Sequence, residues 1–271
     1  MKQLGAFRNA DLRAKKRLGQ HFLKDPQAVA RIIEAATIGP DDTVVEVGAG
    51  PGILTPALAE RAGRVVAIEL DQDVLPVLQE AMAQFDTVEI RNEDVLGIDP
   101  ADLPQPYQVV ANLPYYITSA VIRHFLEAAA RPRSMTLTIQ QEVAERIVAT
   151  PPKMSVLAVS VQLYGRPEIV AAIGRNAFWP VPAVDSAVLR IDRIGQGLEQ
   201  RLQGVSEEGF FKVVRAGFSE KRKQLHNALA RNLGLSHGAA TALLERVGID
   251  PARRAETLTV EDWVRVARAH V

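Results

Sequence analysis

The sequence predicts an α/β fold, with a mostly parallel sheet flanked by helices and a small all-helical region at the C-terminal end. An apolar, β-branched run at 43–47 indicates a buried strand, and it leads through the turn G-A-G-P-G into residues with helical spacing. Short apolar strands then alternate with helical segments as far as residue 191, a pattern typical of parallel sheets. Near Gly195 the pattern changes, and only helical segments follow.

The composition is that of a globular protein. The chain has 271 residues, 47% of them hydrophobic, which is enough for one large domain with a core and a smaller second one. The absence of cysteine excludes disulfides, thiolate zinc sites and a cysteine nucleophile. The basic start, Met1–Arg17, lacks the apolar core of a secretory signal, and no stretch has the unbroken apolar length of a membrane span. We therefore expect a cytoplasmic protein.

The charge is distributed unevenly along the chain, although the net charge is zero. Residues 1–24 carry a charge of +6, residues 25–199 carry −10, and residues 200–271 carry +4. Basic ends around an acidic middle are compatible with a polyanion held by the termini. A solvated tail and an ordinary charged helical surface would give the same distribution, so charge alone leaves both interpretations open.

Residues 1–24 are predicted to form a basic arm. Within it, the stretch K-K-R-L-G-Q-H-F-L ends in Phe22 and Leu23, which we expect to anchor the arm to the core. Gln20 and His21 would then be held near whatever lies beneath them. The alternative is a disordered arm with an incidental histidine.

The glycine-rich turn is the centre of the prediction. Before it, Asp25 is a plausible N-cap for a helix to about Ala36. A strand, a tight turn with Gly48 and Gly50, and a helix bring backbone N–H groups to the end of a sheet strand, where open α/β sheets bind nucleotide-like ligands. The spacing is G-x-G-x-G, with Ile53 at the third glycine of the dinucleotide fingerprint, which weakens a nicotinamide interpretation. A turn with no ligand is the alternative.

Two carboxylates follow at the ends of the next two strands. The strand 64–70 ends in Glu69, 21 residues beyond Gly48, where an acidic side chain can accept hydrogen bonds from ribose hydroxyls. Asp71 is the nearby competitor for that role. After a helix at 72–83 and a strand at 87–91, Asp94 is placed to accept a hydrogen bond from an adenine amino group, although a simple Asx turn is the alternative.

The stretch N-L-P-Y after the strand 107–111 is the most specific in the chain. Asn112 offers a carbonyl acceptor, Pro114 can direct the carbonyl of Leu113 into a cleft, and Tyr115 offers a ring face for a base. Two acceptors and a stacking ring suit a planar group that carries an exocyclic amine. The alternative is a proline-bent loop with buried tyrosines, but it does not explain why an asparagine stands at this position.

The second half of the sheet is predicted with one ambiguity. The expected elements are a helix to about 130, a strand at 134–139, a helix at 140–149, a helix or strand at 155–163, and strands at 167–173 and 187–191. The loop F-W-P-V-P-A-V-D-S precedes the last strand. Its two prolines favour a pre-set stacking surface made by Phe178 and Trp179, with a hydrophobic plug as the alternative.

The C-terminal helices carry a basic cluster. We expect helices at 206–217, 219–232, 236–247 and 259–269. Ser219 is a candidate N-cap for the second of them, which would put Lys221, Arg222 and Lys223 in its first turn, with Arg215 upstream. Three cations are unfavourable there unless an anion offsets them, so we predict contact with RNA or DNA. A solvated face is the alternative.

With these residues in view, the chain resembles the small-subunit (16S) rRNA adenine N6,N6-dimethyltransferase family over nearly its whole length. The stretches that carry the resemblance are L-G-Q-H-F-L, V-E-V-G-A-G-P-G, N-L-P-Y, F-W-P-V-P-A-V-D-S and F-S-E-K-R-K-Q-L-H-N-A-L. The resemblance implies a Rossmann-like methyltransferase domain at 25–195 that uses S-adenosyl-L-methionine (SAM) and an RNA-binding helical domain at 196–271. We also expect a monomer and no metal. His21 departs from the family, where asparagine is frequent, and Met154-Ser155 stands where Tyr-Gly is common.

The resemblance also implies roles for residues at matched positions. The implied SAM-binding residues are His21, Leu23, Gly48, Gly50, Glu69, Asp94 and Asn112. The implied catalytic residues are Asn112, Leu113, Tyr115 and Phe178, of which Tyr115 and Phe178 would sandwich the target adenine. The implied RNA-binding residues are Lys16, Arg17, Arg215, Lys221, Arg222 and Lys223.

The expected reaction is dimethylation of the N6 amino groups of two adjacent adenosines in the 3′-terminal hairpin of 16S rRNA, late in 30S subunit biogenesis. Because the amino nitrogen is a poor nucleophile and the sulfonium methyl is already electrophilic, positioning matters more than acid–base chemistry. Three alternatives remain open at this stage: a 23S rRNA methyltransferase of the macrolide-resistance type, a small-molecule or protein N-methyltransferase, and a non-catalytic ribosome-assembly factor.

Overall fold

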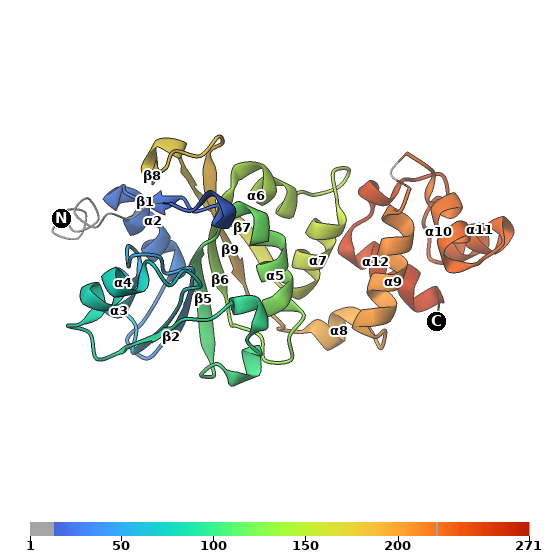
Figure 1. Cartoon of the computed structure of the whole chain (residues 1–271). Coiled ribbons are helices and arrows are strands. Elements are labelled where there is room, and N and C mark those ends of the chain that lie inside the picture. Colours follow the sequence, from blue (N-terminus) through green and yellow to red (C-terminus); the bar gives the residue numbers. More distant parts are fainter. Residues whose placement is uncertain (1–13, 221, 271) are drawn as a thin grey trace. The chain divides into compact units, whose positions relative to one another are not determined.

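A seven-stranded sheet forms the centre of the larger of two units into which the chain divides (Figure 1). The computed structural model describes residues 14–220 and 222–270, without the side chain of Lys16. The larger unit contains the described residues up to Ala144 and the segment Arg166–Ile194. The smaller unit contains Glu145–Gly165 and the chain from Gly195 onward.

The strand order in the sheet is β4-β3-β2-β5-β6-β9-β7. The strands are β2 Thr43–Val47, β3 Arg64–Ile68, β4 Val88–Arg91, β5 Tyr107–Asn112, β6 Met135–Gln140, β7 Arg166–Ile173 and β9 Ser186–Asp192. The strands from β2 to β6 are parallel, whereas β9 runs antiparallel to both β6 and β7. Since β2 lies between β3 and β5, the order of winding reverses there, and a crevice forms beyond the carboxyl ends of these strands.

The helices of the larger unit are amphipathic segments that bury one face on the sheet. They are α2 Pro26–Ala36, α3 Thr55–Ala59, α4 Leu75–Met82 and α5 Thr118–Leu126, while α6 Gln141–Ile147 runs across the boundary between the units. Asp25 caps α2, as predicted, by accepting a hydrogen bond from Gln27 N at 3.0 Å. The inner face of α2, with Ile32 and Ile33, packs with Val44 of β2 in a core cluster that also includes Leu58 of α3.

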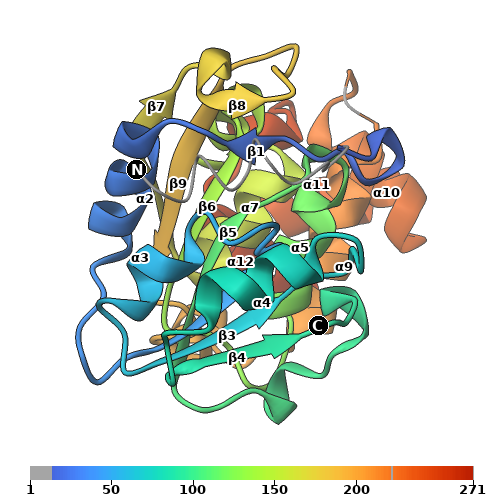
Figure 2. The same cartoon turned by 60° about the vertical axis from the view of Figure 1, so that its left-hand side comes forward.

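A second, two-stranded sheet fixes the arm, and no sequence pattern predicts this sheet. In this sheet β1 Phe22–Leu23 pairs antiparallel with β8 Phe178–Trp179, so the two run side by side in Figure 2. Leu23 and Phe178 are buried in the core cluster. The predicted anchor is therefore confirmed, and it joins the arm to the aromatic loop.

The smaller unit is helical. Its helices are α7 Val156–Tyr164, α8 Leu198–Leu202, α9 Glu207–Phe218, α10 Leu225–Leu233, α11 His237–Arg246 and α12 Val260–His270. Trp263 of α12 is fully buried, and its ring lies 5.4 Å from that of Phe218. None of the helices within the described ranges has the length and apolar character needed to cross a bilayer.

Residues 145–165, which the sequence places with the sheet, group with the helices. The ambiguous segment is helix α7, whose N-cap Ser155 accepts a hydrogen bond from Ala158 N at 3.1 Å. Met154 N donates to Glu256 O at 3.0 Å, and Tyr164 Oη donates to Glu207 Oε2 at 2.6 Å. These contacts join the segment to residues far along the chain, which local patterns do not reveal.

The prediction that Ser219 begins a helix is wrong. Ser219 is the C-cap of α9, and its hydroxyl donates to Ala216 O at 2.7 Å. The N-cap of α10 is Gln224, so Arg222 and Lys223 lie in the connection between α9 and α10. A serine at the C-terminal end of a helix can donate its hydroxyl to a carbonyl of the preceding turn. Here that hydrogen bond takes the place of the predicted N-cap.

Candidate active site

One cavity lies beyond the carboxyl ends of β2, β3 and β5, and it collects most of the predicted site residues. Nine of them line it: His21, Gly48, Gly50, Glu69, Asp94, Asn112, Leu113, Tyr115 and Phe178. Leu23 is not among the lining residues; its side chain lies in the core cluster. Leu18, Phe22 and Tyr116 also line the cavity, and sequence reasoning assigned them no role in it.

The glycine turn has a backbone that other residues rarely adopt. Gly48, Gly50 and Gly52 have φ angles of +73°, +58° and +83°. A Cβ atom on Gly50 would lie 3.3 Å from Cε1 of Phe22, so the turn also passes close beneath the arm. The positive φ angles and the close approach of Phe22 explain why glycine occupies these positions. The turn brings backbone N–H groups to the wall of the cavity.

Glu69 ties the glycine turn to the end of β3. Its Oε2 accepts from Gly50 N and its Oε1 accepts from Asp71 N, both at 2.7 Å. Burial raises the pKa of Glu69, while these two backbone donors oppose the rise. Each carboxylate oxygen has a further lone pair, so Glu69 can still accept from a ligand hydroxyl in the cavity that it lines.

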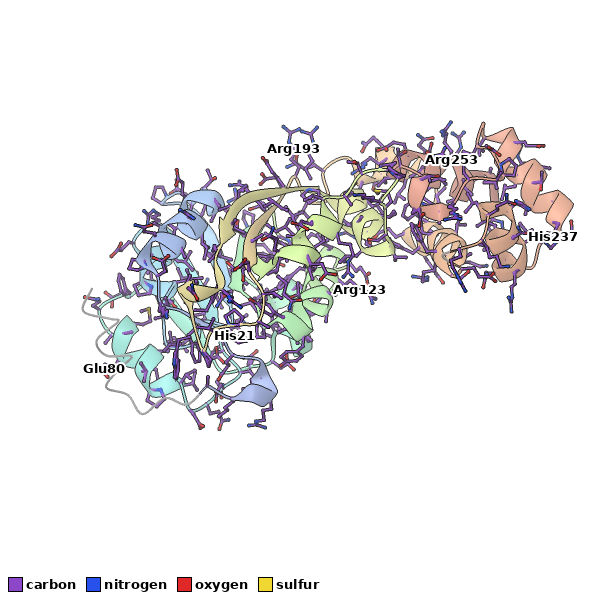
Figure 3. All side chains as sticks on the ribbon, turned by 90° about the horizontal axis from the view of Figure 1, so that it is seen from above. His21, Glu80, Arg123, Arg193, His237 and Arg253 are labelled. Carbon is purple, nitrogen blue, oxygen red and sulfur yellow. The ribbon has the colours of Figure 1, made fainter. Side chains whose placement is uncertain are left out.

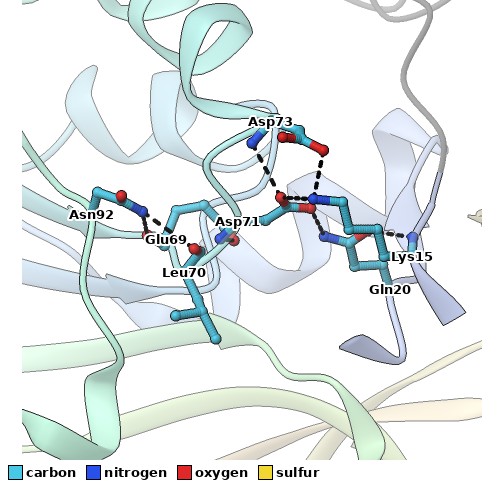
Figure 4. A network of polar contacts seen from close by, with 7 residues as sticks. All are labelled: Lys15, Gln20, Glu69, Leu70, Asp71, Asp73 and Asn92. Carbon is cyan, nitrogen blue, oxygen red and sulfur yellow. Dashed lines mark hydrogen bonds and ion pairs between the residues drawn. The ribbon is translucent and has the colours of Figure 1, made fainter. Parts of the chain in front are cut away.

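Asp71, the competitor for that role, is engaged by the arm. Its Oδ1 contacts Lys15 Nζ at 2.5 Å, and its Oδ2 accepts from Gln20 Nε2 at 2.7 Å (Figure 4). Partial burial opposes ionisation of Asp71, but the hydrogen bonds from Lys15 and Gln20 outweigh it and lower the pKa. This engagement leaves Glu69 as the better candidate for a ribose.

Asp94 combines the two roles considered from the sequence. It caps the short 3₁₀ helix η2, Val95–Gly97, by accepting from Leu96 N at 3.0 Å, which is the Asx-type arrangement. The residue also lines the cavity. One carboxylate can do both, because its two oxygens accept in different directions.

The N-L-P-Y stretch leaves the sheet at the end of β5. Leu113 N donates to Thr138 O of β6 at 3.2 Å. The amide Nδ2 of Asn112 donates to the backbone carbonyl of His21 at 3.0 Å. Tyr115 is held by its hydroxyl, which lies 2.8 Å from Ser186 Oγ, and burial raises its pKa.

His21 connects the arm with both sides of the cavity. Its Nδ1 lies 2.7 Å from the carbonyl oxygen of Pro180, and because a carbonyl only accepts, Nδ1 carries the proton. Its ring stacks on that of Tyr115, with centroids 5.7 Å apart and an interplanar angle of 27°. In the side-chain view His21 lies among the side chains of the larger unit (Figure 3).

Comparison with known proteins shows which family this chain belongs to. A family model described as ribosomal RNA adenine dimethylase matches residues 11–270. The chain belongs to the ribosomal RNA adenine dimethylase family. The match confirms the predicted family. It also confirms that the protein is a methyltransferase and that its methyl donor is SAM.

Two curated relatives carry the same name, ribosomal RNA small subunit methyltransferase A. The chain is 49% identical to the one from Dehalococcoides mccartyi over 255 residues, which is 93% of this chain and 87% of the relative. It is 41% identical to the one from Clostridium botulinum over 257 residues, which is 93% of this chain and 92% of the relative.

Two solved structures of similar architecture confirm the predicted fold class. The 23S rRNA methyltransferase ErmE has a TM-score of 0.74 and 29% identity, covering 92% of this chain and 98% of ErmE. A dimethyladenosine transferase from Plasmodium falciparum has a TM-score of 0.79 and 24% identity, covering 91% of this chain and 96% of that chain. At that identity the second similarity shows the fold alone.

The basic residues of this dimethylase-family chain are distributed over both units. Arg17 is exposed in the larger unit, and Arg215, Arg222 and Lys223 are exposed in the helical unit. Lys221 and the side chain of Lys16 lie outside the described residues. Lys223 and Arg231 line a hollow on the helical unit together with Glu220, Asn227, Ala230, Leu235 and His237. Within the described part of the chain, no group of three or more His, Asp or Glu side chains could hold a metal ion.

Proposed function

We propose that this protein uses SAM to methylate the N6 amino groups of adenosines in small-subunit rRNA. The expected substrate is a pair of adjacent adenosines in the 3′-terminal hairpin of 16S rRNA, within the 30S subunit or its precursor, in the cytoplasm. The family membership and the names of the relatives at 41–49% identity support this proposal. The observation that carries it is the amide of Asn112 at the wall of a cavity that also contains the glycine turn.

The described residues fit SAM. The positive-φ glycine turn brings N–H groups to the cavity, Glu69 offers lone pairs for ribose hydroxyls, and exposed Asp94 suits an adenine amino group. When bound, SAM supplies an electrophilic methyl carbon on a positively charged sulfur. The chain's own residues then have to hold the target nitrogen in line with that carbon.

We assign this positioning to the N-L-P-Y stretch. Asn112 Oδ1 and the carbonyl of Leu113 accept the two N–H bonds of the adenine amino group, which directs the nitrogen lone pair toward the methyl carbon. Tyr115 and Phe178, both at the cavity wall, replace the stacking that an adenine loses when it leaves the RNA. The N–C bond would form as the C–S bond of the donor breaks, and one amino proton then leaves to solvent. One N–H bond remains, so the same geometry supports a second methylation.

The basic residues supply the RNA contact in this proposal. Arg17, Arg215, Arg222 and Lys223 are exposed and carry charges that suit phosphate oxygens. Lys16 and Lys221 are proposed for the same role on the basis of sequence alone. Such contacts hold RNA without reading its sequence, so selection of the adenosines is left to the cavity and to the shape of the subunit.

Methylation of unmethylated 30S subunits with tritiated SAM, followed by nucleoside analysis, tests the proposal. The expected product with the wild-type chain is N6,N6-dimethyladenosine. Asn112→Ala should lose at least about 100-fold in transfer rate while its affinity for SAM, measured by calorimetry, stays within a few-fold. Near-normal transfer by this variant would end the proposed mechanism.

A second candidate function is methylation of 23S rRNA. The similarity to ErmE, at a TM-score of 0.74 over 92% of this chain, favours it. The higher identities to small-subunit enzymes favour 16S rRNA instead. Assays with isolated 50S subunits and naked 23S rRNA beside 30S subunits separate the two, because the favoured substrate alone should incorporate label.

A further inference from the structure

We propose that the arm positions the catalytic amide: the backbone carbonyl of His21 selects which atom of Asn112 faces the substrate. This inference rests on the proposed function, in which Asn112 Oδ1 accepts a hydrogen bond from the target amine. It gives the arm a role in the methyl transfer step in addition to any contact with SAM. His21 and the residues that hold it are therefore positioning residues for the reaction.

The argument begins with the chemistry of a side-chain amide. The end groups of an asparagine amide have almost the same size, yet Nδ2 only donates and Oδ1 only accepts. The atom of Asn112 next to the carbonyl of His21, 3.0 Å away, has to be the nitrogen, because two oxygens there would repel each other. None of the described residues donates to Oδ1, so the acceptor is left for a donor in the cavity.

An amide without this partner would populate both orientations. In the wrong orientation Nδ2 would face the adenine amino group, and two donors would meet with no acceptor between them. Burying such an unmatched pair should slow the transfer by about 5- to 150-fold, which is the rate equivalent of about 1–3 kcal/mol. The contact with His21 therefore matters for the chemistry as well as for the closure of the arm.

His21 is held in place from three sides. Its Nδ1 donates to Pro180 O at 2.7 Å, its ring stacks on Tyr115, and the next residue, Phe22, pairs with Trp179 across the two-stranded sheet. These contacts come from the N-L-P-Y stretch and from the aromatic loop, which are the two sides of the proposed adenine site. The carbonyl of His21 consequently has a fixed place relative to both.

A second set of contacts fastens the arm further upstream, next to the proposed ribose site. Lys15 Nζ contacts Asp71 Oδ1 at 2.5 Å and Asp73 Oδ2 at 2.6 Å (Figure 4). Gln20 bridges the same region, since its Nε2 donates to Asp71 Oδ2 and its Oε1 accepts from Lys15 N, both at 2.7 Å. Gln20 lines the cavity but Lys15 does not, so Lys15 offers a way to disturb the arm without touching the cavity wall.

The Asn112→Asp variant tests the amide contact directly. Aspartate keeps the shape and an acceptor for the amine, but it cannot donate to the carbonyl of His21. We expect single-turnover transfer to 30S subunits at saturating SAM to fall at least about 100-fold. We also expect the backbone amides of residues 20–23 to exchange with deuterium faster than in the wild type. Transfer within threefold of wild type, or unchanged exchange in the arm, would overturn the proposal.

The Lys15→Met variant tests the same coupling from a distance. It removes the ammonium group and keeps most of the side chain, and we expect a fall of about fivefold in transfer rate at saturating substrates, with the Kd for SAM within twofold. Arg64→Met is the matched control, because Arg64 forms an ion pair with Glu89 at 2.7 Å at the opposite end of β3. Equal rates for Lys15→Met and the wild type would contradict the coupling.

A spectroscopic readout separates this inference from the proposed function. In the full chain labelled with ¹⁵N-asparagine and bound to SAM, one side-chain N–H of Asn112 should exchange slowly, and Lys15→Met should speed its exchange whereas Arg64→Met should not. This measurement needs no RNA, so it remains decisive even if the wild type methylates neither 30S nor 50S subunits. Fast exchange of both side-chain protons in the wild type would refute the contact.

Discussion

Replacing Glu46 by glutamine should change how the stability of the protein depends on pH. Glu46 lies in the middle of β2 with 1% of its surface exposed, and it is not among the residues that line the cavity. Among the described residues, neither Glu46 Oε2 nor Thr55 Oγ1 has a partner at ordinary hydrogen-bond geometry, so the nearby Thr55 hydroxyl lowers the pKa of Glu46 by less than burial raises it. Burial, with a smaller effect of the charge on Glu69, raises the pKa of Glu46 from its ordinary value of 4.5 to about 8.

The sign of the effect follows from where the proton is bound. Between pH 4.5 and about 8 the folded protein keeps Glu46 protonated, whereas the unfolded chain releases that proton. The free energy of unfolding therefore falls by about 1.4 kcal/mol for each pH unit in this window, or about 5 kcal/mol across it. The stabilisation is fully present below pH 4.5 and is lost as the pH rises through 8.

Urea unfolding at several pH values from 5 to 8.5 measures this dependence. Glu46→Gln stays neutral at every pH, so the difference between variant and wild type should move in favour of the variant by several kcal/mol as the pH rises. The comparison removes the contributions of other carboxyl groups, including Glu69, because both proteins contain them. Parallel curves for the two proteins would show that Glu46 is ionised in the fold and would refute the reasoning.

Three further outcomes are expected. Gly217→Ala should destabilise the helical unit by about 1–3 kcal/mol in urea unfolding, because its Cβ would lie 2.2 Å from Cη2 of Trp263. Gly48→Ala should lower the free energy of unfolding by about 1 kcal/mol, since its φ of +73° is unfavourable for alanine. The double variant Arg222→Ala with Lys223→Ala should weaken binding to 30S subunits and reduce the salt slope of log K by about 1–2, if both side chains contact phosphates; an unchanged slope would exclude such contacts.

The sheet and much of the cavity could be predicted because their signals are local. The turn around Gly48 and Gly50 follows an apolar strand directly, and the N-L-P-Y stretch after β5 contains its acceptors and its ring in consecutive residues. In parallel strands such signals converge at one edge of the sheet, so the sequence alone indicates that they share a site. Whether each of these residues binds SAM or the adenine stays a prediction.

The anchor of the arm could be predicted, but the partners that hold the arm could not. A strand of two residues, Phe22–Leu23, has no measurable periodicity, and its partner Phe178–Trp179 lies more than 150 residues away. The contacts of Lys15 and Gln20 with Asp71 also span 56 and 51 residues, which is too far for a local pattern to show them. The misplaced N-cap at Ser219 has a different cause, because a serine can end a helix as well as begin one.

The helical unit is assembled from two separate stretches, and this limits how the protein can be divided in the laboratory. A fragment that stops at residue 194 would retain α7, with Ala158, Val159 and Leu163, but would lack the later helices of the unit to which α7 belongs. A chimera that exchanges the helical unit between two family members would have to transfer Glu145–Gly165 together with the chain from Gly195 onward. Exchange at the second junction alone would combine side chains from two lineages inside one hydrophobic interior, where volumes seldom match.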